Sequence, residues 1–284
     1  RAVFCESVSN PALEICDLEA ISKVAHDYNM PLIVDSTFST PYLTRCFDFG
    51  ADIIVTSLTK WVGGHGTGVG GMCIEKGGFN WATGRHPLFD KPDTSYGGLR
   101  WGHDLPETLA PLAYKLRMLT VGLRNIGAAQ SPDNAWMFLQ GIETLSLRMD
   151  RHCENSLKVA EHLKSHPKVA WVRYPGLKDD PEYAKNVKYI KGKGGGMVIF
   201  GIKSADARKA GSTFIDSLKL ISHVANVGDA RTLAIHPATT THSQMSPEQQ
   251  LAAGAPPDMV RLSIGLETAE DILADIDQAL EAAN

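Results

Sequence analysis

Short apolar runs alternate with amphipathic stretches over the first 75 residues. Asp17 can cap a helix, because Leu18, Ile21 and Val24 then fall on one apolar face. The predicted strands are residues 2–6, 31–35 and 52–56, with a looser candidate at 69–75. Apolar strands that are separated by helices are typical of a mostly parallel α/β sheet, covered on both faces.

The pattern changes further along the chain. Residues 76–104 are rich in glycine and proline, so they predict a loop-rich insertion before a helix at about 105–124. Ser131 and Pro132 form a helix-start signal, and the helical pattern runs to about Ser165, long enough to bridge two domains. Strands are then predicted at 168–174, 195–202 and 259–264, and helices at 205–218 and 268–283. We therefore expect a mostly parallel large domain, 1–146, and a smaller α+β domain, 147–284.

Composition and charge exclude several classes of protein. With 43% hydrophobic and 21% charged residues the chain is typical of a globular protein. A net charge of −4 without a basic run gives no attraction to nucleic acid or to anionic membranes, and no apolar stretch is long enough to span a bilayer. The five cysteines are scattered and form no C-x-x-C pair, which favours reduced thiols in a cytoplasmic protein. The chain enters an apolar run directly from Arg1, so we expect it to be part of a longer polypeptide.

Polar side chains follow two of the predicted strands. Asp35 ends one strand, and the segment Ser57-Leu58-Thr59-Lys60 follows the next. Ligands of parallel sheets bind beyond the carboxyl ends of the strands. Two hydroxyls before Lys60 and six glycines within 63–71 suit a phosphate group. A lone lysine in such a turn is more often a solvated surface charge, and a lone Asp is equally often a cap.

Several motifs together change that balance. They are Glu6-Ser7-Val8-Ser9-Asn10-Pro11, Val34-Asp35-Ser36-Thr37-Phe38, Ser57-Leu58-Thr59-Lys60, Gly63-Gly64-His65-Gly66, Gln140-Gly141-Ile142-Glu143-Thr144-Leu145, Arg148-Met149-Asp150-Arg151-His152, Gly228-Asp229-Ala230, His236-Pro237-Ala238-Thr239 and Val260-Arg261-Leu262-Ser263-Ile264-Gly265-Leu266-Glu267. In this order they resemble the trans-sulfuration (Cys/Met metabolism) enzymes that depend on pyridoxal 5′-phosphate (PLP). The resemblance covers essentially the whole chain and implies PLP-dependent transferase fold type I, which is aspartate-aminotransferase-like.

The resemblance implies a role for each matching residue around the cofactor. Lys60 would be the Schiff-base lysine and the proton shuttle, and Asp35 would face the pyridinium nitrogen, where an anion keeps the ring an electron sink. Ser57 and Thr59 would contact the phosphate. The other implied positions are Asn10 at the ring hydroxyl, Thr37 near the ring face and Glu6 behind them.

For the substrate, the resemblance implies that Arg261 binds the α-carboxylate, a task that suits its planar fork. Asn226 and Val227 would lie in the loop that helps to hold this carboxylate, although many relatives have Ser where Asn226 stands. His65, His236 and His242 lack the tight spacing of metal ligands, so we expect structural roles for them and no metal.

The insertion indicates a branch of the family. Gly77-Gly78-Phe79-Asn80-Trp81 and Pro92-Asp93-Thr94-Ser95-Tyr96 resemble the O-acetylhomoserine sulfhydrylases. The implied reaction joins O-acetyl-L-homoserine with sulfide or a thiol to give homocysteine or methionine and acetate. The implied assembly is a homotetramer, a dimer of dimers with shared active sites. Methionine γ-lyase and cystathionine γ-synthase remain alternatives, as does an inactive, truncated binding or assembly module. The family's N-terminal phosphate loop, its ring-stacking tyrosine and the Tyr/Arg pair given by a neighbouring subunit are expected to precede Arg1.

Overall fold

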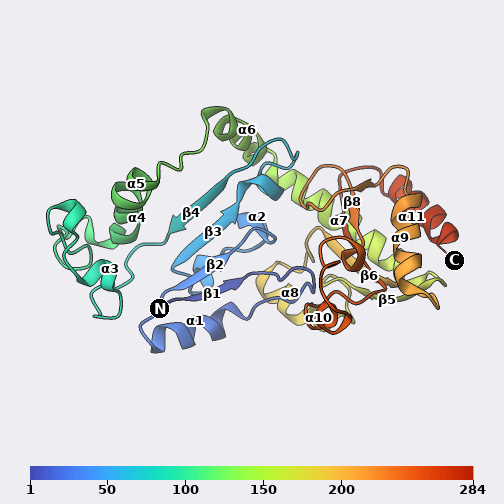
Figure 1. Ribbon diagram of the computed structural model, residues 1–284, viewed down its shortest axis with the longest axis horizontal. Helices are drawn as coiled ribbons and strands as arrows, with labels where there is room; N and C mark the ends of the chain where they lie inside the picture. The colour runs from blue at the N-terminus through green and yellow to red at the C-terminus, as the bar shows by residue number, and fades with distance from the viewer. Residues whose placement is uncertain (284) are drawn as a thin grey trace.

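The computed structural model describes residues 1–283 and contains two sheets, one in each half of the chain (Figure 1). The strands of the first sheet are β1 (Val3–Glu6), β2 (Leu32–Asp35), β3 (Ile53–Ser57) and β4 (Gly71–Glu75), in that spatial order. The helices of this half are α1 (Leu18–Asp27), α2 (Thr40–Leu43), α3 (Pro87–Asp90), α4 (Ala113–Arg117), α5 (Arg124–Ile126) and α6 (Pro132–Glu143).

Three strands of the first sheet are parallel, as the sequence predicts. In the register of β1, β2 and β3, Glu6 lies opposite Asp35, and Asp35 lies opposite Val55. The carboxyl ends of the three strands therefore lie side by side. Asp17 caps α1 by accepting a hydrogen bond from the Ala20 amide, at 3.2 Å.

The fourth strand is the antiparallel member of this mostly parallel sheet, since β4 runs antiparallel to β3. The chain folds back after β3 in a short π-helical turn, Leu58–Val62, and the Leu58 amide donates to the Gly70 carbonyl at 3.0 Å. No crossover helix separates the two strands, and the chain returns along β3 in the opposite sense. The sheet is also less covered than predicted, since Met72 and Ile74 of β4 are exposed.

The second sheet has the order β5–β6–β9–β8–β7 and lies at the other end of the molecule (Figure 1). Its strands are β5 (Val169–Arg173), β6 (Met197–Ile202), β7 (Ser222–His223), β8 (Leu233–Ile235) and β9 (Met259–Ser263). The helices of this half are α7 (Leu145–Ser165), α8 (Tyr183–Tyr189), α9 (Ala207–Ser217), α10 (Pro247–Ala252) and α11 (Ala269–Ala282). Every side chain of β6 and β9 is buried.

The long bridging helix predicted for 131–165 is two helices, α6 and α7, which meet at Thr144. Gly141 of α6 approaches the turn after β3 closely, because an added Cβ would lie 2.3 Å from the Val62 carbonyl oxygen. α7 contacts the turn after β3 as well as β5 and β6, so it joins the two halves. The domain boundary at 146/147 lies near the start of α7 and stays a prediction, and Asn284, with which the second predicted domain ends, lies outside the described residues.

Three apolar cores support this arrangement. One lies between the first sheet, α1 and the start of α7 and includes Trp61; another fills the second domain around β6 and β9. A third joins Ile53 of β3 to Trp81, Phe89 and Trp101 of the insertion. Within residues 1–283, no helix combines the length and apolar character that a bilayer crossing requires.

Candidate active site

Lys60 lies in the turn directly after β3, at the carboxyl end of the parallel strands. Its φ and ψ of −89° and −127° are not helical, and they interrupt the turn at this residue. The half-buried ammonium group donates a hydrogen bond to Asn226 Oδ1, from the loop before β8. Burial lowers the pKa of Lys60, and the nearby Arg261 charge lowers it further. A lysine with a lowered pKa offers a neutral amine more readily, as a carbonyl-binding lysine must.

Asp35 and Thr37 tie the segment after β2 to the segment after β3. The Thr37 amide donates to Asp35 Oδ1 at 2.8 Å, and the Ser57 amide donates to Thr37 Oγ1 at 2.9 Å. Thr37 is buried. Among the described residues, Asp35 Oδ2 accepts no hydrogen bond that satisfies the usual geometry, so one carboxylate oxygen can face a cationic ligand atom.

The two hydroxyls that were predicted to contact a phosphate differ in their surroundings. Thr59 Oγ1 accepts from the Gly70 amide at 3.0 Å and lies 3.3 Å from the Gly70 carbonyl, so it holds the start of β4 against the turn. Ser57 is half-buried and is the last residue of β3, two residues before Thr59. Its backbone amide donates to Thr37 Oγ1. The phosphate role of both hydroxyls stays a prediction.

Arg261 on β9 brings the second domain to this end of the first sheet. Its side chain is buried; Nη1 donates to Asn10 Oδ1 at 2.9 Å, and Nη2 donates to the Asn226 carbonyl at 3.3 Å. Burial lowers the pKa of Arg261 to about 10. Among residues 1–283, no Asp or Glu forms an ion pair with Arg261, as the ion pairs of the structure lie elsewhere. A buried guanidinium held only by amide oxygens is suited to a carboxylate ligand.

The remaining predicted residues take different places. Asn10, predicted at the ring hydroxyl, is an exposed loop residue that contacts Arg261. Val227, predicted in the carboxylate loop, packs in the core with Trp61. Glu6 ends β1 beside Asp35, and its pKa is raised by burial and then by the Asp35 charge.

The three histidines that were considered as metal ligands have protein partners. His236 is buried and lies 2.8 Å from the Pro257 carbonyl and 2.9 Å from Thr239 Oγ1. His65 Nδ1 lies 2.7 Å from the Gly63 carbonyl, and His242 Nδ1 lies 2.9 Å from Thr241 Oγ1. Residues 1–283 contain no group of three or more His, Cys, Asp or Glu side chains that could hold a metal ion.

The sequence profile of the Cys/Met metabolism PLP-dependent enzymes matches residues 1–281. The chain belongs to this family. Two curated relatives are an O-acetyl-L-homoserine sulfhydrylase of Leptospira meyeri, 49% identical over 286 residues, and O-acetyl-L-homoserine sulfhydrylase 1 of Thermus thermophilus, 50% identical over 281 residues. Both alignments cover 99% of this chain but only 64% and 65% of the relatives, so the chain spans less than two thirds of their length.

Solved structures of the Cys/Met metabolism family share the fold. A crystal structure described as an O-acetylhomoserine (thiol)-lyase of Campylobacter jejuni matches 99% of this chain and 66% of its own, with a TM-score of 0.91 and 40% identity. That structure carries N′-pyridoxyl-lysine-5′-monophosphate at its position 205. A cystathionine γ-lyase of Lactobacillus plantarum matches 100% of this chain and 64% of its own, with a TM-score of 0.79 and 28% identity. The PLP-dependent fold type I predicted from the motifs is confirmed.

The residues of this chain fit the cofactor of the Cys/Met metabolism family. Lys60 presents an amine whose pKa is lowered, and one Asp35 carboxylate oxygen accepts no hydrogen bond from residues 1–283, which suits a protonated ring nitrogen. Within the same residues, the Arg261 guanidinium bonds to amide oxygens only, which suits a carboxylate ligand. The three groups come from β9 and from the ends of two neighbouring parallel strands.

Two residues near Lys60 were in the quoted motifs without an assigned role. Arg148 on α7 is buried and donates to the Trp61 carbonyl, at 2.6 Å. Gly228 lies against the same turn, where an added Cβ would be 2.5 Å from the Trp61 amide nitrogen. In the sequence, Arg148 was marked only by its place in a quoted motif; its burial is a finding of the structure.

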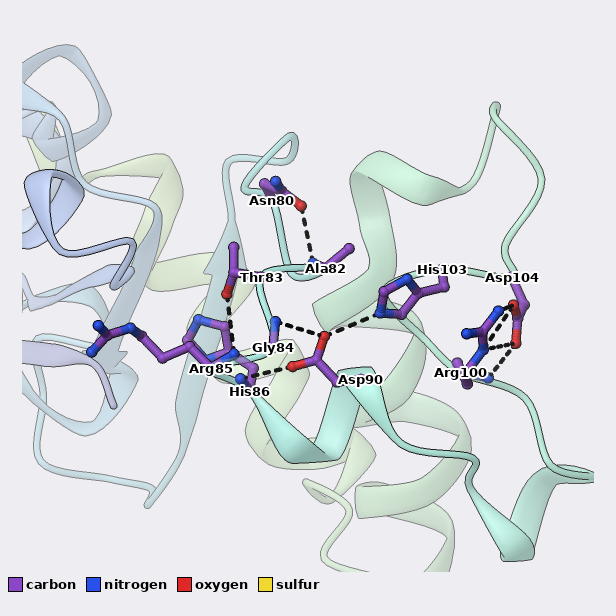
Figure 2. Close-up of polar contacts among 10 residues, drawn as sticks. All are labelled: Asn80, Ala82, Thr83, Gly84, Arg85, His86, Asp90, Arg100, His103 and Asp104. Atoms are coloured by element: carbon purple, nitrogen blue, oxygen red, sulfur yellow. Dashed lines mark hydrogen bonds and ion pairs between the residues drawn. The ribbon is translucent and has the colours of Figure 1, made fainter.

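The insertion lies away from Lys60 of its own chain. Glu75, where β4 ends, pairs with Ile53 at the amino end of β3, whereas Lys60 follows the carboxyl end. Figure 2 shows Asp90 at the centre of the insertion's polar contacts, accepting hydrogen bonds from the Gly84 and His86 amides at 3.1 and 2.9 Å. The segment that best indicates the branch of the family is therefore remote from the candidate site within one chain.

Proposed function

We propose that this chain carries the cofactor-binding and substrate-binding residues of an O-acetyl-L-homoserine sulfhydrylase. The observation that carries the proposal is the Lys60 amine, with its lowered pKa, beside a buried Arg261 that lacks a carboxylate partner among the described residues. The choice of reaction is supported by the two relatives of that name, at 49% and 50% identity.

In the proposed reaction, the Cγ–O bond of O-acetyl-L-homoserine breaks and acetate leaves. A Cγ–S bond then forms with sulfide or a thiol, which gives homocysteine or methionine. PLP, when bound, supplies an electron sink for the charge that is left at Cα. Lys60 would hold the cofactor through its amine and would move protons at Cα and Cβ of the substrate. Proton transfer by a positioned side chain contributes about 10²–10⁴-fold to a rate.

The other residues bind and orient. Arg261 holds the substrate carboxylate through its fork, with Asn10 and the Asn226 carbonyl keeping the guanidinium in place. Asn226 Oδ1 holds the Lys60 amine at rest. We propose that Asp35 faces the ring nitrogen; Thr37 fixes its carboxylate and Glu6 lies beside it. Ser57 and Thr59 are proposed to contact the phosphate, and Val227 anchors the Asn226 loop in the core.

The test supplies O-acetyl-L-homoserine and sulfide to the chain in the presence of PLP. Homocysteine and acetate in equal amounts are expected. Release of 2-oxobutyrate and ammonia would instead favour methionine γ-lyase, and formation of cystathionine from cysteine would favour cystathionine γ-synthase. If no product forms and no PLP attaches to Lys60, the chain is a binding or assembly module.

We further propose a homotetramer, a dimer of dimers with shared active sites. Support comes from large apolar side chains that are exposed on the stretch from α4 to α6, namely Met118, Leu119, Leu123, Ile126, Trp136 and Leu139. Contiguous exposed apolar surface marks interaction sites. Light scattering should give about four times the 30.8 kDa chain mass, and a monomer at micromolar concentration would contradict the proposal. We also propose a cytoplasmic location, which the five free thiols favour.

A further inference from the structure

Arg148 is a buried cation that the proposed reaction does not use. It lies on the first turn of α7 with an exposed fraction of 6%. Its Nη1 donates to the Trp61 carbonyl at 2.6 Å, and its Nη2 donates to the Val62 carbonyl at 3.0 Å and the Gly141 carbonyl at 2.6 Å. Nε donates to Thr144 Oγ1 at 3.1 Å. The guanidinium therefore donates hydrogen bonds to carbonyls of the turn that holds Lys60 and to a carbonyl near the end of α6.

Neutral oxygens alone offset this charge. Among residues 1–283, the ion pairs leave Arg148 without an Asp or Glu partner, and burial lowers its pKa. Taking a guanidinium out of water costs several kcal/mol, which carbonyl dipoles offset only when their geometry is held. Arg151, three residues further along α7, is the opposite case, because its side chain is 55% exposed beside Glu154. Because burying Arg148 costs free energy, its bonds to these carbonyls must offset that cost, and they hold the turn in a fixed place.

The backbone around the Lys60 turn leaves little freedom for any other side chain. A Cβ on Gly64 would lie 2.2 Å from Arg148 Nη1, and a Cβ on Gly228 would lie 2.5 Å from the Trp61 amide nitrogen. The Trp61 ring is fully buried and packs edge-on against His152, one turn after Arg148 on α7, with ring centroids 4.9 Å apart. Arg148 and Gly228 therefore both lie against the backbone of the turn that holds Lys60.

We infer that Arg148 is a positioning residue, which fixes the Lys60 amine by clamping the carbonyls of Trp61 and Val62 to α7 and to the end of α6. This inference rests on the proposed function, because the position of Lys60 matters only if its amine reacts. Among residues 1–283, the Arg148 side chain bonds to the carbonyls of Trp61, Val62 and Gly141 and to Thr144 Oγ1, so it acts through the backbone of the turn. Without the clamp, the Lys60 amine would leave its half-buried place between Asn226 and Arg261.

Displacement of the Lys60 amine should change, in a known direction, the pH at which the amine becomes reactive. Burial and then the Arg261 charge hold the pKa of Lys60 below its ordinary value of 10.5, so its neutral, reactive form is present at lower pH than for a solvated lysine. If the amine moves out, both causes weaken, and the pH at which Lys60 becomes reactive rises. A loss of global stability alone lowers the folded fraction without moving this midpoint.

The experiment measures pyridoxylation of Lys60 against pH in the full chain. PLP is added, the adduct is trapped by cyanoborohydride, and the modified peptide is quantified by mass spectrometry. For Arg148→Met we expect a rise in the midpoint pH and about a tenfold lower yield at a fixed, subsaturating PLP concentration, since charge-assisted bonds are lost. Arg148→Lys keeps the charge but not the fork, so it should lie between Arg148→Met and the wild type. The matched control, Arg151→Met, should leave both values unchanged.

Thermal unfolding accompanies each variant. Should Arg148→Met fail to fold, Arg148→Lys and Thr144→Val carry the test. Thr144→Val keeps the guanidinium but removes the acceptor of Nε, together with the 3.4 Å contact from Thr144 Oγ1 to the Gly141 carbonyl. Both should raise the midpoint, Thr144→Val by less. A folded Arg148→Met variant with the wild-type midpoint and yield would overturn the inference. Unchanged midpoints in both Arg148→Lys and Thr144→Val would overturn it as well. A wild-type chain whose Lys60 takes no pyridoxyl group would instead overturn the proposed function, whatever the variants do.

Discussion

The turn after β3 and the insertion at the opposite end of the sheet use polar side chains in different ways. In the insertion, Asp90 accepts from two amides and lies 3.1 Å from His103 Nε2, while Arg100 and Asp104 pair with each other (Figure 2). At the turn, the cations Lys60 and Arg261 both donate to Asn226, and neither forms an ion pair with a carboxylate of residues 1–283. Polar groups that bond to one another, as in the insertion, stabilise a loop. Cations that lack an acidic partner, as at the turn, are suited to bind an anionic ligand.

Of the variants considered, Lys60→Ala should lower homocysteine formation the most. A smaller loss than in the other variants would contradict the contrast between the turn and the insertion. Removing the amine that carries the cofactor and moves protons should lower homocysteine formation by about 10²–10⁴-fold or more, with little change in thermal stability. Lys23→Ala is the control, because the Lys23 side chain is 78% exposed on α1. Activity above one tenth of the wild-type value in Lys60→Ala would contradict the role of this lysine.

Arg261→Lys should come next. The charge remains but the fork is lost, so KM for O-acetyl-L-homoserine should rise by about 10–100-fold, which corresponds to about 1.5–3 kcal/mol. The turnover rate should change less, since the lost contact is made in both the ground state and the transition state. Arg208→Lys, at an exposed position on α9, is the matched control. An unchanged KM would exclude Arg261 from carboxylate binding.

Asn226→Asp sharpens the electrostatic part of the comparison. A carboxylate in place of the amide favours the charged form of Lys60 and raises its pKa, so the pH midpoint of Lys60 pyridoxylation should move upward. Asn226→Ser keeps an oxygen that can accept the hydrogen bond and should lower the pyridoxylation rate by only about 2–10-fold. A midpoint that moves downward in Asn226→Asp would contradict the contact with Lys60.

Asp90→Asn should have the smallest effect on the site and a local effect on the insertion. Burial acts to raise the pKa of Asp90, but hydrogen bonds from His103, Gly84 and His86 hold it below its ordinary value of 3.8. Because the folded-state pKa is depressed, this stabilisation is present above pH 3.8 and is lost as pH falls through the folded-state pKa. The variant should lose about 1–2 kcal/mol of unfolding free energy at neutral pH, and this loss should shrink in acid. Unchanged stability at neutral pH would show that Asp90 does not hold the insertion, and a changed pyridoxylation midpoint would link the insertion to the site.

Local signals in the sequence predicted the strands that end in Asp35 and in Ser57, because apolar runs and turn residues mark such elements directly. The motifs that surround Lys60 predicted the family and the fold. The antiparallel course of β4 was not predicted, since strand direction depends on pairing with Gly70 and its neighbours rather than on local pattern. The break at Thr144 was not predicted either, because the helical pattern of the sequence runs through this residue.

Long-range contacts in the candidate site escaped sequence reasoning for the same physical reason. Asn10 meets Arg261 across 251 residues, and Asn226 meets Lys60 across 166. No local pattern records such pairs, and the place of Asn10 at the ring hydroxyl, which the resemblance implies, stays a prediction. Val227 shares the loop of Asn226, but its apolar side chain turns into the core, as burial of hydrophobic surface favours.

The attachment of PLP to Lys60 is the central claim, and one measurement tests it most directly. The wild-type chain is incubated with PLP and reduced with borohydride, and the pyridoxyl mass on the Lys60 peptide is compared with that on the peptide of the exposed Lys23. The lowered pKa of Lys60 and its half-buried place near Asn226 and Arg261 predict modification of Lys60 well ahead of Lys23, at a lower pH midpoint. Equal modification of both lysines, or none on Lys60, would contradict the account.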